Sequence, residues 1–156
     1  MISYPGWYNE EGNIDECYKH WNEEADKVQK LWPGKPFLIS ETGAGAVYEW
    51  NNDTNVQWSQ MFQSEVVYAD AFVALNNSLI SGISLWQFGD IKANHEYYET
   101  KSGCNFHWYP DETIVSFVNI SCHRPKSENN KGSVDYWRRY KDAFDVVQKL
   151  FSNFTE

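Results

Sequence analysis

The 156-residue sequence predicts an α/β fold built around a parallel sheet. Short, continuously apolar runs alternate with longer segments in which apolar residues recur every three or four positions. This alternation is typical of buried strands joined by amphipathic crossover helices, and the length fits one buried core. The three predicted strands would leave both sheet edges unpaired. We therefore expect a part of the protein outside this sequence to complete the sheet.

The predicted strands are the short apolar runs, which cover residues 1–4, 37–40 and 80–88. The first run stops at Pro5-Gly6. Between the third strand and the last helix, residues 89–133 are polar, contain Gly and Pro, and show no period, so they predict a long loop.

The predicted helices follow from the spacing of apolar residues. Two helices are expected over residues 14–32 and 58–75, ended by Pro33-Gly34 and by Asn76-Asn77 respectively. One face of a last helix is predicted to carry Trp137, Tyr140, Phe144, Val147 and Phe151. The resulting order is strand, helix, strand, helix, strand, long loop, helix.

The composition excludes several classes of function. A net charge of −9 argues against a nucleic-acid partner, because phosphate contacts need clustered Lys and Arg. No run of about eighteen apolar residues is present, so no membrane span is expected. The aromatic content of 17% suits a large core, and aromatic rings in loops also stack on the apolar faces of sugars.

The N-terminus has no features of a signal peptide, yet the chain contains four glycosylation sequons. The acceptor residues would be Asn52, Asn76, Asn119 and Asn153. A secreted or lysosomal protein with further residues before Met1 would reconcile these two observations.

Glu41 is the first candidate for chemistry, because it directly follows the buried run 37–40 and precedes Thr42 and Gly43. In parallel α/β sheets, ligands meet the C-terminal ends of the strands. A carboxylate at such a position loses hydration, which hydrogen bonds or a function must offset. The alternative role is purely structural, with Glu41 capping the next helix or meeting a buried Arg.

Two other kinds of site are disfavoured. Gly43-Ala-Gly-Ala-Val begins like a dinucleotide-binding turn, but Tyr48 stands where the third glycine belongs. The cysteines and histidines match no common zinc spacing, so we expect neither a metal nor a cofactor. These residues are His95, Cys104, His107, Cys122 and His123. A disulfide between Cys104 and Cys122, with Cys17 left free, is the preferred pairing, although spacing alone does not decide it.

Four motifs occur in order along nearly the whole chain. They are Tyr4-x-Gly-Trp-Tyr8, Lys35-Pro-Phe-Leu-Ile-Ser-Glu41-Thr-Gly-Ala, Ile83-Ser-Leu-Trp86-Gln-Phe-Gly-Asp90, and Asn130-Lys131-Gly132 with Arg138-Arg139 and Lys141 after it. Together they resemble the last three strands of the catalytic barrel of glycoside hydrolase family 2, which includes β-glucuronidases, β-galactosidases and β-mannosidases. The resemblance implies that residues 1–156 are a partial catalytic domain, about the last three βα units of a (β/α)8 TIM barrel. The N-terminal domains and the first barrel strands would lie outside this sequence.

The resemblance also implies roles in hydrolysing O-glycosidic bonds with retention of configuration. Glu41 would be the nucleophile, and Tyr4 or Tyr8 would donate a hydrogen bond to it. Trp86 would form the floor of the sugar pocket, with Asp90 supporting that strand end. The Asn-x-Lys-Gly form at residues 129–132 matches the segment with which β-glucuronidases hold the sugar carboxylate.

Asn129 and Lys131 would therefore read a uronic acid. An ammonium and an amide donor pair well with a C6 carboxylate and gain little from a neutral hydroxymethyl group. The alternative is a solvated turn leading into the last helix. Arg124 is a further candidate cation.

One expected catalytic residue is missing from this sequence. The family pattern has its general acid/base Glu after an Asn on an earlier strand, but Asn9-Glu10 lies in a predicted loop and Asn22-Glu23 in a predicted helix. We therefore expect the isolated chain to be inactive and to depend on the missing N-terminal half. Family members are often homo-oligomers.

The sequence also allows two alternatives to a β-glucuronidase. One is a β-galactosidase or β-mannosidase of the same family. Another is a non-catalytic carbohydrate-binding remnant in which Glu41 is a relic. The presence of Glu41 together with intact neighbouring motifs argues against such decay.

Overall fold

A computed structural model describes residues 1–8, 13–51, 55–92 and 128–152. The fold is mixed α/β, as predicted. Its long elements are α1 (Asp15–Leu31), β1 (Phe37–Thr42), α2 (Gln60–Asn76), β2 (Ile80–Leu85) and α5 (Asp142–Ser152). Two short strands, β3 (Ile91–Lys92) and β4 (Glu128–Asn129), pair antiparallel beyond the end of β2.

β1 and β2 lie parallel, as predicted, whereas the predicted first strand, residues 1–4, forms only a single bridge. β1 pairs with β2 in parallel register, with Phe37 opposite Ile80 and Thr42 opposite Leu85. The N-terminal residues run along the other edge of β1, where Ile2 forms a parallel bridge with Glu41. The Met1 ammonium donates to the Leu38 carbonyl at 2.7 Å, and Ser3 N donates to the Glu41 carbonyl at 3.2 Å. Three successive segments therefore end at the same edge of the sheet.

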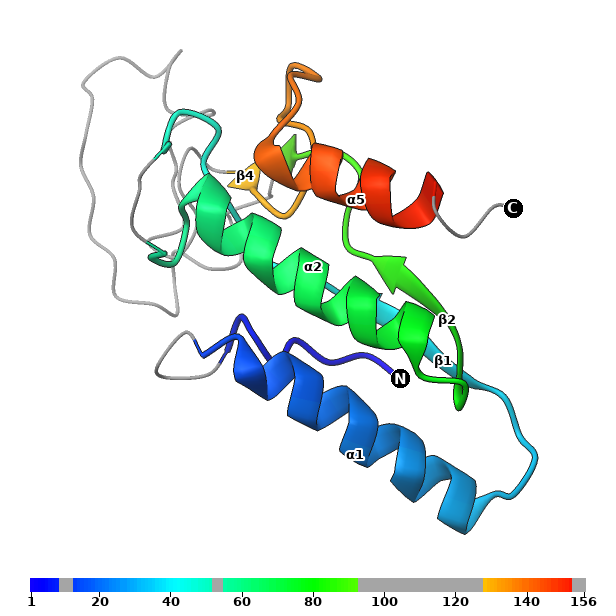
Figure 1. The fold of residues 1–156 in the computed structure, drawn as a ribbon. Helices are drawn as coiled ribbons and strands as arrows, with labels where there is room; N and C mark the ends of the chain where they lie inside the picture. The colour runs from blue at the N-terminus through cyan, green and yellow to red at the C-terminus, as the bar shows by residue number, and fades with distance from the viewer. Residues whose placement is uncertain (9–12, 52–54, 93–127, 153–156) are drawn as a thin grey trace, which may run out of the picture.

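One face of this sheet is covered and the other is open. Figure 1 shows α1 and α2 side by side on the same side of β1 and β2. Phe37 and Ile39 point to this side and are 4% and 0% exposed. They pack in a core cluster with Trp21, Ala25, Val73, Ala74 and Ile80. On the opposite face, Leu38 is 51% exposed and Ser40 is also exposed.

The turn after the N-terminal segment is anchored to both helices. Trp7 is buried in a second core cluster with Cys17, Ala44, Phe62, Val66 and Ala69. Gly6 lies so close to α1 that a Cβ at this position would stand 2.7 Å from the Cys17 sulfur. The packing of Trp7 thus fixes where the flanking Tyr4 and Tyr8 stand.

Two predicted element boundaries are wrong near the loops. Strand β2 ends at Leu85 rather than residue 88, because the Gln87 backbone bonds elsewhere. Gln87 N donates to the Lys131 carbonyl at 2.9 Å, and Ser133 N donates to the Gln87 carbonyl at 3.0 Å. The predicted loop 89–133 likewise contains the paired strands β3 and β4 at its two ends.

The last helix is also shorter than predicted. It begins at Asp142, so Trp137 and Tyr140 precede it and are 73% and 65% exposed. The chain turns before the helix because the Asp135 carboxylate accepts hydrogen bonds from Arg139 N at 2.8 Å and Nε at 2.6 Å. Arg138, inside this turn, has a positive φ of 69°.

Several sequence-based predictions lie outside the described residues. These are the Cys104–Cys122 pair, the metal candidates His95, His107 and His123, the cation Arg124, the Asn9-Glu10 pair, and the sequons at Asn52, Asn119 and Asn153. Within the described residues, Cys17 is a buried free thiol, and Asn22-Glu23 lies inside α1 as predicted. None of the helices that the structure describes has the length and apolar character that crossing a membrane requires.

The alternation of buried and exposed side chains along β1 predicts how substitutions change the stability of the purified chain. Ile39→Ala should lower the free energy of unfolding by about 2–5 kcal/mol, because the side chain is fully buried. Leu38→Ala is the matched control and should cost less than about 1 kcal/mol in this chain, because Leu38 lies half in solvent. Urea unfolding of both variants measures the difference. Equal losses would contradict the assignment of one covered and one open face.

Candidate active site

Glu41 lies at the end of β1 with its side chain half-buried. The burial of Phe37 and Ile39 on the helix side sets the register of β1, which delivers Glu41 to the edge where the N-terminal segment also ends. This edge is the C-terminal end of the parallel strands, where ligands bind in α/β sheets.

The hydroxyl of Tyr4 donates a hydrogen bond to Oε1 of Glu41. Burial raises the pKa of Tyr4 well above its ordinary value, and the hydrogen bond and negative charge of Glu41 add to this shift. Tyr4 therefore keeps its proton and remains a donor throughout the physiological pH range. A fixed donor on one carboxylate oxygen orients the other oxygen for attack or for binding.

A cation stands against the same tyrosine. The Lys131 ammonium lies 3.4 Å from the ring centroid of Tyr4, and 5.1 and 5.2 Å from those of Trp7 and Tyr8. Ring faces attract cations, by about 2 kcal/mol where the ammonium is shielded from water. Tyr4 thus touches Glu41 through its hydroxyl and Lys131 through its ring. Through Tyr4, the structure brings together Glu41 and Lys131, two predicted site residues that are ninety positions apart in the chain.

Trp86 follows β2 and is joined to the end of β1. Its backbone N donates to the Thr42 carbonyl at 2.7 Å, and its side chain is 39% exposed. Gly43 makes this approach possible, because a Cβ there would lie 2.5 Å from the Trp86 carbonyl oxygen. Gly43 also has a φ of +145°, which disfavours other residues. The glycine of the Glu-Thr-Gly sequence is therefore required by the close contact between the ends of β1 and β2.

Asp90 occupies a buried position behind this edge and is 2% exposed. Its carboxylate pairs with the Lys141 ammonium at 2.8 Å and accepts a hydrogen bond from Gly132 N at 2.8 Å. Burial raises the pKa of Asp90 to about 6, against the opposing effect of Lys141. Burial lowers the pKa of Lys141, which Asp90 counteracts. Asp90 thus holds the 129–132 segment.

A second buried carboxylate supports the end of β1. Asp70 of α2 is 0% exposed and accepts hydrogen bonds from Trp21 Nε1 at 2.8 Å and from Thr42 Oγ1 at 2.7 Å. Burial raises its pKa to about 6, and the hydrogen bonds oppose this rise. Since Thr42 directly follows Glu41, Asp70 fixes the backbone beneath the candidate nucleophile. The sequence signal for Asp70 is an acidic residue inside the apolar stretch of a buried helix, which the spacing of apolar residues alone did not single out.

The remaining predicted site residues lie around Tyr4 and Lys131. Tyr8 packs edge-on against Tyr4, with ring centroids 5.7 Å apart, but is 73% exposed. Asn129 ends β4, and its side-chain oxygen accepts a hydrogen bond from Lys131 N at 3.4 Å. Tyr4, rather than Tyr8, makes the predicted hydrogen bond to Glu41.

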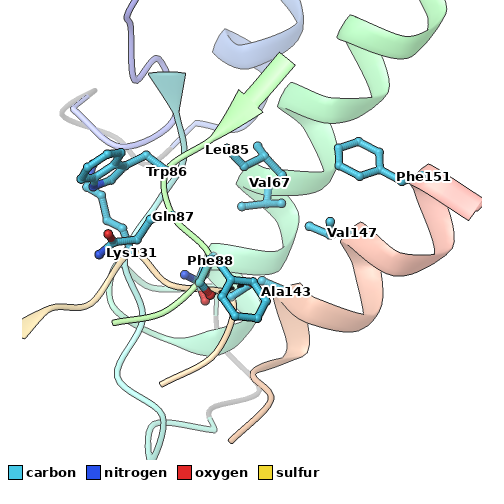
Figure 2. Close-up of a pocket in the computed structure, with 11 residues that line it drawn as sticks. Val67, Leu85, Trp86, Gln87, Phe88, Lys131, Ala143, Val147 and Phe151 are labelled. Carbon is cyan, nitrogen blue, oxygen red and sulfur yellow. Dashed lines mark hydrogen bonds between the residues drawn. The ribbon is translucent and has the colours of Figure 1, made fainter. Parts of the chain in front are cut away.

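A cavity of about 210 Å³ lies next to this edge, between the end of β2, α2 and α5. Figure 2 shows Trp86 and Lys131 on one side of it and Val147 and Phe151 of α5 on the other. Glu41 does not line this cavity, whose walls are largely apolar. Within the ranges that the structure describes, no cluster of three or more His, Cys, Asp or Glu residues is arranged to hold a metal ion.

Known proteins resemble this chain in sequence and in fold. No family model matches it. A β-glucuronidase of Streptococcus agalactiae is 25% identical over 97 residues, which are 58% of this chain and 15% of that protein. A GH2 β-galacturonidase from Eisenbergiella tayi, solved with bound galacturonate, superposes with a TM-score of 0.74 at 27% identity, over 97% of this chain and 23% of its own.

A further solved structure shares the fold. The β-glucuronidase of Faecalibacterium prausnitzii superposes with a TM-score of 0.65 at 24% identity, over 97% of this chain and 21% of its own. The chain thus spans less than a quarter of the length of these three proteins. The predicted resemblance to glycoside hydrolase family 2 enzymes of the β-glucuronidase type is confirmed.

The raised pKa of Asp70 predicts that the free energy of unfolding depends on pH. Its pKa is raised from 3.8 to about 6 in the fold, so the folded state binds the proton more tightly than the unfolded chain. The stabilisation from this proton is complete below about pH 4 and is lost as the pH rises through about 6, by roughly 3 kcal/mol in total. The Asp70→Asn variant has no carboxylate at this position, so it should not lose this stability as the pH rises. The titration of Asp90 contributes equally to the free energies of unfolding of wild type and Asp70→Asn, so it cancels in their difference.

The measurement is urea unfolding of wild type and Asp70→Asn between pH 4 and pH 7. The difference between their free energies of unfolding should shift by most of this amount, about 2 kcal/mol. Asp26→Asn, on the exposed surface of α1, is the control and should show a nearly constant difference. A constant difference for Asp70→Asn as well would show that the buried carboxylate does not titrate in this range.

Proposed function

We propose that this chain, which resembles glycoside hydrolase family 2 enzymes in sequence and fold, supplies the nucleophile of a retaining exo-acting β-glycosidase. Residues 1–156 would form about the last three βα units of a (β/α)8 barrel, with Glu41 at the mouth of that barrel. The observation that carries the proposal is the contact of Tyr4 with both Glu41 and Lys131, at the end of parallel strands.

The open face of the sheet supports the barrel assignment. In a closed barrel, strand residues alternate between the surrounding helices and the interior. Phe37 and Ile39 meet the helices here, whereas Leu38 and Ser40 face the uncovered side. Among the described residues, neither the N-terminal segment nor β2 has a strand partner on its outer edge. Further strands would pair with these edges and enclose Leu38.

The proposed reaction is a double displacement. The Glu41 carboxylate attacks the anomeric carbon, and the bond to the aglycone oxygen breaks as a carboxylic acid protonates that oxygen. Water, deprotonated by the same acid/base group, then attacks the anomeric carbon of the glycosyl ester and releases Glu41. The two carboxyl groups of such an enzyme lie about 5 Å apart. The acid/base is proposed to come from the barrel strands outside this chain.

The proposed substrate class is a β-uronide, with a β-glucuronide as the preferred member. Lys131 carries a positive charge beside the candidate nucleophile, and Asn129 lies next to it. A sugar carboxylate would gain a charge-assisted hydrogen bond here, whereas the hydroxymethyl groups of galactosides or mannosides would gain little. The galacturonate-bound relative makes a β-galacturonide the second candidate, since it carries the same carboxylate.

Activity should depend on Glu41 and on the rest of the barrel. In the full-length protein, Glu41→Gln should abolish hydrolysis of an aryl β-glucuronide, because an amide cannot form the glycosyl ester. Glu24→Gln, the same change on α1 away from the strand ends, should keep wild-type rates. The isolated 156-residue chain should show no hydrolysis above background. Turnover by the isolated chain that Glu41→Gln abolishes would sink the claim that the acid/base lies elsewhere.

Lys131 should determine the preference for a uronide. In the full-length protein, Lys131→Ala should lower kcat/KM for an aryl β-glucuronide by roughly 10- to 100-fold, the usual cost of losing a hydrogen bond to a charged group. Hydrolysis of the matching β-glucoside should change much less, because it lacks the carboxylate. Lys92→Ala is the control, since Lys92 pairs with Glu128 instead of lying on the Tyr4 ring. An unchanged ratio between the two substrates in Lys131→Ala would rule out carboxylate recognition by this residue.

A further inference from the structure

The Lys141 ammonium is a fully enclosed charge behind the candidate site. Its side chain is 0% exposed and bonds to three separate loops. It contacts both oxygens of Asp90, at 2.8 and 2.9 Å, the carbonyl of Ala46 at 2.7 Å and the carbonyl of Asn130 at 3.0 Å. Lys141 therefore joins the segments that follow β1 and β2 to the segment that carries Lys131.

The backbone on both sides of Lys131 is fixed by this ion pair. The Asn130 carbonyl accepts from Lys141, and Gly132 N donates to Asp90 at 2.8 Å. The Gln63 side chain adds a hydrogen bond to the Gly132 carbonyl at 2.9 Å. Gly132 also fits too tightly for a side chain, because a Cβ there would collide with Asp90 N. The Lys131 side chain extends from this fixed backbone onto the ring of Tyr4.

Stability alone is a weak reason to bury such a pair. Removing two charges from water costs several kcal/mol per ion, and apolar replacements of similar volume are often as stable or more so. Hydrogen bonds of an ion pair are directional, however, and they fix the loops that they join. The arrangement therefore favours a geometric role at the site edge over a contribution to stability.

We propose that Asp90 and Lys141 are positioning residues for uronide specificity. They would hold residues 129–132 so that Asn129 and Lys131 meet the sugar carboxylate. This inference rests on the proposed function. Displacement of a binding group by about 1 Å can cost on the order of 100-fold in rate. A folded variant in which residues 129–132 have shifted should therefore lose its preference for the uronide but still carry out the reaction at Glu41.

The test measures kcat/KM of the full-length protein for an aryl β-glucuronide and for the matching β-glucoside. Asp90→Asn and Lys141→Met should each lower the glucuronide-to-glucoside ratio by about 10-fold or more, chiefly through KM for the glucuronide. Asp70→Asn is the matched control, since Asp70 is an equally buried carboxylate that bonds to Thr42 rather than to residues 129–132. It should affect both substrates by the same factor and leave the ratio unchanged.

A double variant, Asp90→Leu with Lys141→Met, separates positioning from folding. It replaces the pair by apolar side chains and should retain a cooperative unfolding transition. Its glucuronide-to-glucoside ratio of kcat/KM should nevertheless fall as far as in the single variants. If the folded double variant keeps the wild-type ratio while Lys131→Ala loses it, the positioning proposal is overturned and the uronide assignment stands. If Lys131→Ala also keeps the ratio, the uronide assignment itself fails, and the positioning proposal fails with it.

Discussion

The parallel pairing of three successive chain segments is the constraint on which the candidate site depends. Ile2 pairs with Glu41 on one side of β1, and Thr42 pairs with Leu85 on the other. A shift of one residue in β1 would move Phe37 and Ile39 out of the core and would reverse the direction of every side chain. Burial of two apolar residues therefore holds the Glu41 carboxylate within reach of the Tyr4 hydroxyl.

Two buried carboxylates support this edge in different ways. Asp70 is held by neutral donors, Trp21 and Thr42, and acts on the strand that bears Glu41. Asp90 is held by a cation and acts on the segment that bears Lys131. In each case the hydrogen bonds offset part of the lost hydration, so the charge can stay inside the fold. Different buried carboxylates thereby support the candidate nucleophile and the candidate carboxylate-binding group, which both contact Tyr4, one at its hydroxyl and the other at its ring.

The features that follow from local pattern were predictable from sequence. The apolar runs identified β1 and β2, the helical spacing identified α1 and α2, and the position of Glu41 after a buried run identified the candidate site. Asp70 and Lys141 were not identified as supports, because their partners are 28 and 51 residues away along the chain. Trp137 and Tyr140 were assigned wrongly to the last helix. Their spacing imitates a helical face, whereas the bonds between Asp135 and Arg139 turn the chain before Asp142.

The proposed function requires that Glu41 form a covalent bond with the sugar. It is tested most directly by treating the full-length protein with a 2-deoxy-2-fluoro-glucuronyl fluoride. The fluorine at C2 slows hydrolysis of the ester more than its formation when the leaving group is activated, so the glycosyl-enzyme accumulates. Mass spectrometry of the digested protein should find the added uronyl group on Glu41. A label on another carboxylate, or rapid turnover with no label on any residue, would contradict the account.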